Sequence, residues 1–264
     1  MIRSLYTAVS GLITQEAKQD VITNNLANAN TVGFKSDNLA VKKFNDVLIE
    51  NYDKIENGRN VRNVIGSLSL GSQIDGVNTE FTQGTIQDTN KWTDAAIDGK
   101  GFFSVSRNEN GVDTTYYTRD GHFHVNSQGI LVNDSGDKVL AKAIDDNGQA
   151  VGADAPINAG SSELKIASDG SFEMDGKKYK LSTVDFSDYN SLKKMGDNLY
   201  QGTNPISNAD VSVKQSSLEK SNVDVMSEMV NMMTVMRVFE SNQKVVQSID
   251  ETLNKTVNEV GTVR

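Results

Sequence analysis

The two histidines of the chain, His122 and His124, are the residues whose type and spacing come closest to a reactive or metal-binding pattern. They flank Phe123 in a predicted strand, so their side chains point to the same face, as a metal site requires. The chain has no cysteine and no third histidine, so carboxylates such as Asp120 would have to complete the ligands. We therefore expect a solvated strand face here, and we predict no metal and no cofactor.

Three further segments have part of the pattern of a functional loop. Residues 145–148 and 133–137 have the Asp and Asn content of calcium loops but lack the spacing and the closing Glu, which favours plain turns. Residues 98–101 are rich in glycine but lack the rest of a phosphate loop. Spacing singles out no pair of acids for glycoside hydrolysis, because Asp is common throughout the chain. We predict no catalytic residues and a protein that is not an enzyme.

Composition excludes several classes of protein. The 264 residues include 26 basic and 35 acidic side chains, and a net charge of −9 argues against binding to nucleic-acid phosphates. No apolar run approaches the roughly 20 residues that cross a bilayer, so we expect no membrane insertion. The absence of cysteine excludes thiolate catalysis and disulfides. Ser4, Thr7 and Ser10 interrupt the apolar start of the chain, so we expect no cleaved signal peptide.

Both ends of the chain have helical periodicity. At the N-terminus, a helix seam spaced 3, 4 and 3 residues apart predicts an amphipathic helix that ends near residue 33. Its members are Ile2, Leu5, Val9 and Leu12. At the C-terminus, alternating steps of 4 and 3 from residue 225 predict a second helix with a longer seam. Its apolar members are Val225, Met229, Met232, Met236, Phe239, Val246, Leu253, Val257 and Val260.

The C-terminal helix is too long for the globular domain of its own chain to cover its apolar stripe. Forty residues at 1.5 Å each make a rod of roughly 60 Å, about twice the diameter of a small domain. The N-terminal helix or helices of other subunits must therefore cover the stripe, and the stripe is longer than the N-terminal helix. We predict a coiled-coil-like helical domain whose partners include other chains.

The middle of the chain predicts β structure. Turn pairs that contain glycine recur about 7–12 residues apart, as in hairpins and meanders. They are Asn110-Gly111, Asp120-Gly121, Gln128-Gly129, Ser135-Gly136, Asn147-Gly148, Asp169-Gly170 and Asp175-Gly176. The predicted fold class is α+β, with a discontinuous helical axial domain of residues 1–45 and 215–264. Residues 79–214 are predicted to form a central, all-β and hairpin-rich outer domain.

Residues 46–78 are predicted to be an extended linker that braces the assembly. Four glycines punctuate residues 51–78, which favours a loop. The same stretch carries too many apolar side chains for a purely solvated linker. Two interpretations stay open, a segment that becomes ordered along neighbouring subunits or an extended β-hairpin.

The N-terminal segment carries a resemblance to a known family. Ser10-Gly11-Leu12 followed by residues 23–35 resembles the signature of the bacterial flagellar rod, hook and hook-associated axial proteins. The motif positions are Asn24, Asn25, Leu26, Ala27, Asn28, Thr31, Gly33, Phe34 and Lys35, and Val32 stands where many members have Pro.

The likeness continues to the end of the chain. Residues 81–84, 95–103 and 117–121 resemble landmarks of the family's central domain. Residues 218–224, followed by 228–230 and 237–240, resemble its C-terminal signature. Length and segment 51–78 favour the distal rod type, with proximal rod and hook proteins as alternatives.

The resemblance implies a structural subunit of a helical, hollow shaft that transmits torque. The implied partners are further copies of the chain, neighbouring rod and hook proteins, and the flagellar type III export machinery. The implied location is the flagellar basal body, in the cell envelope outside the cytoplasmic membrane. Phe44 and Leu48 fit the pattern that the family presents to the export gate, with hydrophobic packing as the alternative. A secreted β-domain binder or hydrolase would instead need a convergent polar cleft, which the sequence does not display.

Overall fold

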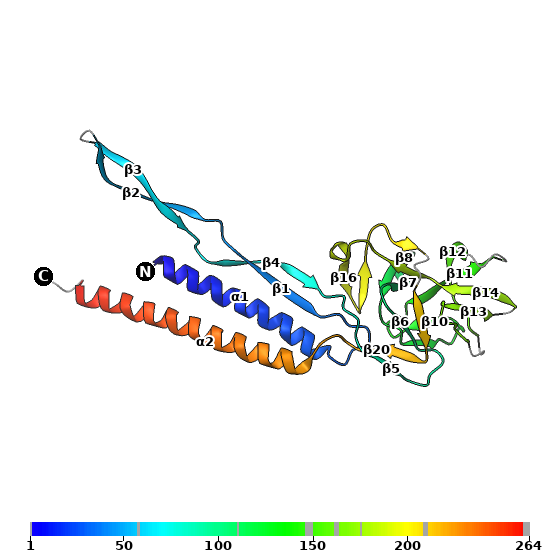
Figure 1. The fold of residues 1–264 in the computed structure, drawn as a ribbon. Coiled ribbons are helices and arrows are strands. Elements are labelled where there is room, and N and C mark those ends of the chain that lie inside the picture. The colour runs from blue at the N-terminus through cyan, green and yellow to red at the C-terminus, as the bar shows by residue number, and fades with distance from the viewer. Residues whose placement is uncertain are drawn as a thin grey trace. The chain divides into compact units, whose positions relative to one another are not determined.

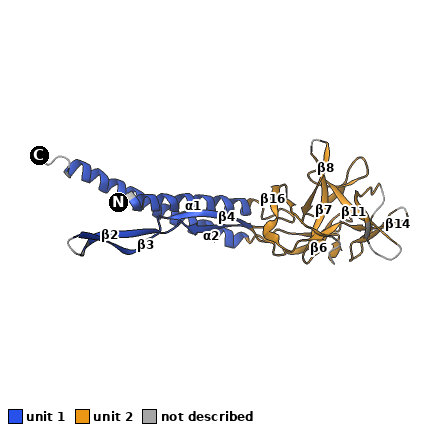
Figure 2. Cartoon of the chain, turned by 90° about the horizontal axis from the view of Figure 1, so that it is seen from above, with its two compact units in different colours: residues 1–26, 37–78, 225–264 blue, residues 27–36, 79–224 orange. Residues whose placement is uncertain are grey.

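In the computed structural model the described residues are 2–56, 59–109, 111–145, 150–160, 164–174, 176–207 and 211–260. They form two compact units (Figure 2). Unit 1 consists of Met1–Leu26, Asp37–Asn78 and Val225–Arg264, and unit 2 consists of Ala27–Ser36 and Thr79–Asp224. Each unit is therefore built from segments that lie far apart in the sequence.

Unit 1 combines two helices with four strands (Figure 1). Helix α1 spans Ile2–Ala27, and helix α2 spans Val225–Lys255 and continues into a π-helical turn at Thr256–Val260. The strands are β1 (Asp37–Lys43), β2 (Val47–Glu56), β3 (Arg59–Leu68) and β4 (Ser72–Thr79). β1 pairs with β4, and β2 pairs with β3 as an antiparallel hairpin. Neither helix has a stretch long and apolar enough to cross a membrane.

The predicted coiled-coil-like helical domain is wrong. In the part of the chain that the structure describes there is one α-helix near each end, and strands complete the unit that contains them. The helices run antiparallel, because Gly11 lies against the side chain of Asn242 and Asn25 bonds to Glu228 (Figure 1). Glycine and polar side chains thus occupy positions that a coiled coil fills with apolar knobs.

Hydroxyl groups of α1 fix the segment that leads into β4. Thr7 Oγ1 donates to the carbonyl of Leu70 at 3.2 Å, and Thr14 Oγ1 lies 3.2 Å from Ser72 Oγ. The backbone N–H of Ser72 donates to Ser10 Oγ at 3.3 Å. Hydrogen bonds from three side chains therefore join α1 to the segment before β4 and to its first residue.

Residues 47–56, 59–68 and 72–78 lie in strands, and the first two ranges pair as a hairpin, as one of the two interpretations expects. The β2–β3 hairpin has register shifts between Ile49 and Glu50 and between Asn51 and Lys54. Its tip at residues 57–58, including Gly58, lies outside the described residues. The hairpin exposes apolar side chains along both strands, so burial within the subunit does not explain them.

The regular elements of the described part of unit 2 are strands, apart from one short 3₁₀ turn. They are β5 (Ile86–Asp88), β6 (Ala95–Asp98), β7 (Phe102–Glu109), β8 (Val112–Thr118), β9 (Phe123–Val125), β10 (Leu131–Asn133), β11 (Lys138–Ile144) and β12 (Ala150–Pro156). They continue with β13 (Ser171–Met174), β14 (Lys177–Leu181), β15 (Thr183–Asp185), β16 (Lys193–Gly196), β17 (Leu199–Gln201), β18 (Ile206–Ser207), β19 (Ser212–Gln215) and β20 (Ser217–Glu219). A short 3₁₀ turn at Tyr189–Ser191 interrupts them.

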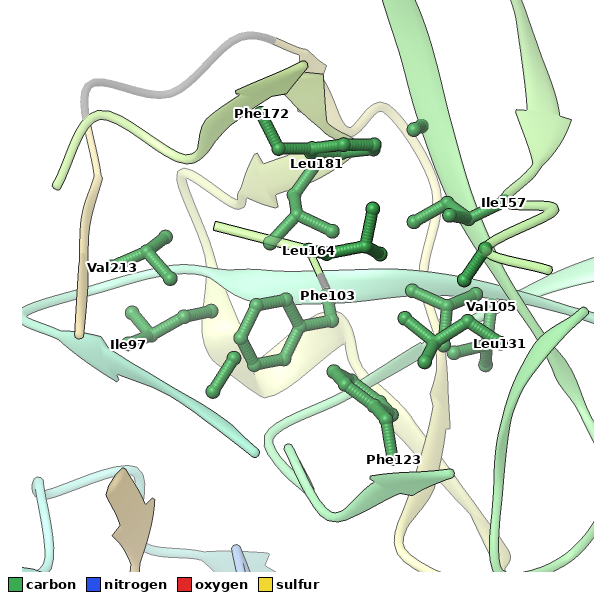
Figure 3. Close-up of a cluster of buried hydrophobic side chains, with 14 of the residues drawn as sticks. Ile97, Phe103, Val105, Phe123, Leu131, Ile157, Leu164, Phe172, Leu181 and Val213 are labelled. Carbon is green, nitrogen blue, oxygen red and sulfur yellow. The ribbon is translucent and has the colours of Figure 1, made fainter. Parts of the chain in front are cut away.

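One large antiparallel sheet organises unit 2. Its main path runs β13-β14-β11-β7-β8-β17-β16, and two separate ladders pair β19 with β6 and β20 with β5. Side chains of the central strands pack into one continuous hydrophobic core around Phe103, Val105, Phe123 and Leu131 (Figure 3). Phe103 and Phe123 meet edge to face with ring centroids 5.4 Å apart. A second cluster gathers aromatic rings around Phe102 and Tyr200.

Several predicted turns connect these strands. The turns at Gly129, Gly136 and Gly170 each close with a hydrogen bond from the glycine N–H to the carbonyl three residues earlier. Asn110, Asp175 and the pair Asn147-Gly148 lie outside the described residues, as does most of the calcium-like segment 145–148.

Candidate functional site

The two histidines lie beside carboxylates on unit 2. His122 Nδ1 is 3.0 Å from Oδ1 of the buried Asp94. His122 Nε2 and His124 Nδ1 each lie 3.8 Å from Asp134 Oδ1. Burial raises the pKa of Asp120 to about 6. Within the described ranges no three His, Asp or Glu side chains form a group that could hold a metal ion. The contacts of His122 and His124 join the start of β9 to the loops that carry Asp94 and Asp134.

Asn25 is the most buried polar residue of the N-terminal motif within unit 1. Its amide group bonds to both backbone groups of Asp37, with Nδ2 donating to the carbonyl at 2.9 Å and Oδ1 accepting from the N–H at 3.0 Å. Nδ2 also donates to Glu228 Oε1 at 3.0 Å. One side chain therefore fixes the end of α1, the start of β1 and the first turn of α2.

The motif residues after α1 belong to unit 2. Gly33 has a φ of +67°, and its N–H donates to the carbonyl of Glu219 at 2.8 Å. A Cβ at this position would approach the backbone of Arg119 and Asp120 within 2.5–2.7 Å, so only glycine fits. Phe34 is buried, and Lys194 Nζ lies 4.0 Å above its ring. The glycine therefore lets the N-terminal segment pass close to the sheet.

Lys35, Glu219 and Arg119 form a buried ion cluster. Lys35 Nζ is 2.6 Å from Glu219 Oε1 and donates to the carbonyl of Thr82 at 2.6 Å. Arg119 NH1 lies 3.2 Å from Glu219 Oε2, and Gly84 N–H donates to Oε1 at 2.8 Å. Burial lowers the pKa of Lys35, against the raising effect of Glu219. Two cations thus share one buried carboxylate, which links segments from the start, middle and end of unit 2.

Asn222 completes the same junction. Its Oδ1 accepts from the N–H of Ser36 at 2.8 Å, and its Nδ2 donates to the carbonyl of Glu80 and to Thr82 Oγ1 at 2.8 and 2.9 Å. Glu219, Arg119 and Asn222 were not predicted as site residues. Each lies in a segment that carries the family resemblance, which is the signal that could have identified them.

The remaining motif residues lie at or near the surface of their units. Asn24 and Ala27 are exposed, and Leu26, Asn28 and Thr31 are half-buried. Thr31 Oγ1 donates to Asn28 Oδ1 at 3.1 Å, which stabilises the turn after α1.

The structure brings only part of the N-terminal seam together. Leu5 and Leu12 are half-buried, Val9 is exposed, and the side chain of Ile2 lies outside the described residues. The side chains that α1 buries are instead Ala8, Thr14, Ile22 and Asn25. Two of these are polar and bond to strands, so apolar spacing alone could not find this face.

The inward face of α2 is rotated relative to the predicted seam. The least exposed positions are Glu228, Met232, Val235, Phe239, Asn242, Val246, Ile249 and Leu253. They share Met232, Phe239, Val246 and Leu253 with the prediction. The other described seam members, Val225, Met229, Met236 and Val257, are exposed, and the side chain of Val260 lies outside the described residues.

An apolar groove of about 510 Å³ lies within unit 1, between α1 and the strands. It is lined by Tyr6, Val9, Ser10, Ile13, Phe44, Asn45, Leu70 and Gln73. Phe44 of the predicted export pattern therefore lines the groove, and Leu48 is exposed on β2.

Comparison with known proteins gives matches along nearly the whole chain. The family model described as flagella basal body rod protein matches residues 5–35, the flagellar hook protein FlgE/F/G D1 domain matches 96–174, and the flagellar basal body rod FlgEFG protein C-terminal model matches 214–259. The flagellar basal-body rod protein FlgG of Bacillus subtilis is 33% identical over 98% of this chain and 99% of its own length. FlgF of Caulobacter vibrioides is 32% identical over the full length of both chains. FlhO, a flagellar hook-basal body complex protein of Bacillus subtilis, is 29% identical, also over full length.

Proposed function

The chain belongs to the family of flagellar basal-body rod proteins, and on that premise we propose how it assembles. It is a structural subunit of the bacterial flagellar rod. Copies of the chain polymerise helically through unit 1 and bind neighbouring rod and hook proteins. The subunit has no catalytic role, reaches the cell envelope through the type III export machinery without a cleaved signal peptide, and transmits torque.

The distribution of exposed apolar side chains carries this proposal. Among the described residues, 27 large hydrophobic side chains are exposed, and 24 of them belong to unit 1. Unit 2 exposes only three in its described part, Val112, Met195 and Ile206. Large exposed apolar surfaces on a folded protein mark places where other molecules bind. Unit 1 is therefore the part of the subunit that other copies cover.

Unit 1 has two apolar surfaces of different shape, which supports a helical polymer. One is the groove beside α1, and the other is the convex outer face of α2 with Val225, Met229 and Val230. When a surface of one copy binds a different surface of the next, the contact repeats and produces an open helical filament. We assign these two surfaces to contacts between copies.

The β2–β3 hairpin has the bracing role in this proposal. An isolated two-stranded ribbon is marginally stable in water. This ribbon exposes Leu48, Tyr52, Ile55, Val64 and Ile65, so contact with other subunits would stabilise it. Residues 46–78 therefore brace neighbouring subunits in the assembled rod.

The two ends of the chain and its middle have separate roles in the assembled shaft. Residues 1–45 and 215–264 face its axis, and residues 79–214 form the outer part. The subunit is of the distal rod type, an assignment that rests on the length of the chain and on segment 51–78. The exposed Phe44 and Leu48 remain available to the export gate in a chain that has not yet assembled.

A matched pair of substitutions tests the proposal. Ile65 on β3 and Val112 on β8 are equally exposed strand residues, at 63% and 66%. Ile65→Asp should prevent or weaken rod assembly and motility in a complemented deletion strain, because the charge enters an apolar contact between subunits. Val112→Asp should leave both unchanged. Normal swimming and normal rods with Ile65→Asp would contradict the role of unit 1.

A deletion tests the bracing role separately. Asn51 pairs with Asn63 across the hairpin, so removing residues 51–63 takes away the distal part of both strands, six residues of β2 and five of β3. The expected result is exported subunits with a folded unit 2 and a softer or unstable rod. Rods of unchanged stiffness in purified basal bodies would contradict bracing while leaving polymerisation through α1 and α2 intact.

A further inference from the structure

Five of the chain's eight methionines lie within eleven residues of α2. Four of them lie on the outer face of the helix, and their side chains are exposed. They are Met226 at 73%, Met229 at 49%, Met233 at 50% and Met236 at 42% exposure. Their spacing of 3, 4 and 3 residues places them in one stripe, about a third of a turn away from the inward face. The fifth, Met232, lies on the inward face and is half-buried.

We propose that this methionine face, defined as Met226, Met229, Met233 and Met236, is a site of oxidative modification that controls assembly. The inference rests on the proposed function, because its consequence is the loss of a contact between subunits. The modifying agents are small two-electron oxidants that transfer oxygen, such as hypochlorous acid or hydrogen peroxide.

The chemistry needs no group from the protein beyond the thioether. With hypochlorous acid, the methionine sulfur gains one oxygen, the O–Cl bond breaks, and chloride and a proton are released. Sulfur loses two electrons, and chlorine gains them. With hydrogen peroxide the O–O bond breaks and water leaves. The chain has no cysteine, so no thiolate in the same molecule competes for the oxidant.

Exposure decides which methionines react first. The four outer side chains are exposed, whereas Met232 is half-buried on the inward face of α2. Oxidation should therefore divide the methionines of one helix into a fast group and a slow one. It should leave the inward contacts of α2, and hence the fold of the free subunit, unchanged.

Sulfoxide formation changes the character of the outer face. A flexible apolar thioether becomes a polar sulfoxide, which disrupts interfaces rich in methionine. Four sulfoxides in one stripe would convert an apolar contact surface into a polar one. An oxidised free subunit is therefore excluded from the rod, and a methionine sulfoxide reductase would restore it.

The first experiment measures the site without assembly. Purified full-length monomer is treated with a limited amount of hypochlorous acid and digested with trypsin, which cuts after Lys220 and Arg237. All five methionines then lie in one peptide, so fragment ions compare them under identical conditions. We expect the four outer residues to oxidise at least about fivefold faster than Met232, as their exposure predicts. Equal rates for all five would overturn the site.

The second experiment measures the consequence. Untreated, oxidised and variant subunits are compared for polymerisation in vitro and for motility in a complemented strain. Oxidised wild type should lose polymerisation, and replacing all four outer methionines with leucine should preserve assembly and make it resistant to oxidant. Met226→Gln, Met229→Gln, Met233→Gln and Met236→Gln together should imitate the oxidised state. Met195→Gln, at an equally exposed position of unit 2, is the matched control and should assemble normally.

The outcomes distinguish the role of the methionine face, the effect of oxidation on assembly and the proposed function. If the leucine variant assembles but remains sensitive to oxidant, the methionine face is not the control point. If oxidised wild type and the glutamine variant assemble normally, the consequence is overturned even though the oxidation pattern stands. If the untreated wild-type subunit supports motility in cells but forms no polymer in vitro, the proposed polymerisation of copies of this chain is overturned instead.

Discussion

Units 1 and 2 are opposite in what they bury. Of the 29 buried hydrophobic residues in the described chain, 26 belong to unit 2, and only Ala8, Ile22 and Val235 belong to unit 1. The exposed large hydrophobic side chains have the reverse distribution, with 24 of 27 in unit 1. Unit 2 therefore has a core of its own, whereas unit 1 leaves most of its large apolar side chains exposed.

The difference extends to polar groups. Unit 2 buries charged side chains, in the ion cluster of Lys35, Arg119 and Glu219. In its described part, unit 1 buries two polar side chains, the neutral Thr14 and Asn25, which bond to backbone groups, to a hydroxyl and to the carboxylate of Glu228. The described part of one chain thus combines a unit that has its own core with a unit whose large apolar side chains are mostly exposed. Four sets of substitutions test this difference.

The largest effect is expected from Glu219→Gln in unit 2. The amide keeps an acceptor for Gly84 but removes the charge that Lys35 and Arg119 share, so two buried cations face each other. Breaking a buried ion pair by removing one partner costs about 3–5 kcal/mol. Trp92, the chain's single tryptophan, packs against the core of unit 2, so its fluorescence during urea unfolding reports this unit.

Two controls accompany this measurement. Glu173→Gln makes the same change at an exposed position of unit 2 and should leave the midpoint nearly unchanged. Lys35→Met combined with Glu219→Gln should recover part of the loss, because one of the two unpaired cations is gone. A wild-type midpoint for Glu219→Gln alone would show that the cluster does not stabilise unit 2.

The next effect compares the same substitution in both units. Ile97 is fully buried in the core of unit 2, and Ile22 is a rare buried residue of unit 1. Removing a buried isoleucine side chain costs about 2–5 kcal/mol where the neighbours cannot collapse into the cavity. We expect Ile97→Ala to reach the upper part of this range and Ile22→Ala the lower. Trp92 fluorescence reports the first, and circular dichroism at 222 nm, dominated by α1 and α2, reports the second. A larger loss for Ile22→Ala would reverse the comparison.

The sequence predicted the parts of the molecule that apolar spacing determines. Met232, Phe239, Val246 and Leu253 of the predicted seam are half-buried in the structure. The rest of the inward face of α2 was missed because Asn242 and Glu228 occupy it, opposite Gly11 and Asn25. Counting apolar positions alone places the predicted stripe too far toward Met229 and Met236, which are exposed. The coiled-coil-like domain was wrong for the same reason.

The buried ion cluster shows a different limit. Lys35, Arg119 and Glu219 lie 84 and 100 positions apart in successive steps, and charged residues are usually found at the surface. Spacing gives no hint that they meet, because only the folded sheet brings their segments together. Lys35 entered the predicted motif through the family resemblance, and its role in the structure could not be read from its type.

A smaller effect is expected from Asn25→Ala in unit 1. The substitution leaves the N–H and C=O of Asp37 without their side-chain partner, which costs about 1–3 kcal/mol. Asn25→Asp should cost more, because it loses the donor and places a carboxylate beside Glu228. Helical circular dichroism on urea unfolding measures both, and Asn24→Ala at an exposed neighbouring position is the control. A loss of Trp92 signal at the same denaturant concentration would mean that the two units unfold together, which would contradict a unit 2 that is stable by itself.

The smallest effect concerns pH. Burial raises the folded-state pKa of Asp120 to about 6, above the ordinary value of 3.8, with Asp134 and Asp94 adding to the shift and His122 opposing it. The folded state thus holds this proton more tightly than the unfolded chain. The contribution to stability is fully present below about pH 4 and is lost as the pH rises through about 6.

Asp120→Asn keeps an acceptor for the N–H of His122 and removes the titration, so the variant should gain about 1 kcal/mol relative to wild type between pH 5 and 8. Trp92-monitored unfolding across this range measures the gain, and Asp169→Asn, at a carboxyl whose hydrogen bonds to Ser171 lower its pKa, should show no such gain above pH 5. A stability difference between wild type and Asp120→Asn that does not change with pH would mean that this carboxyl is already ionised and solvated in the folded unit.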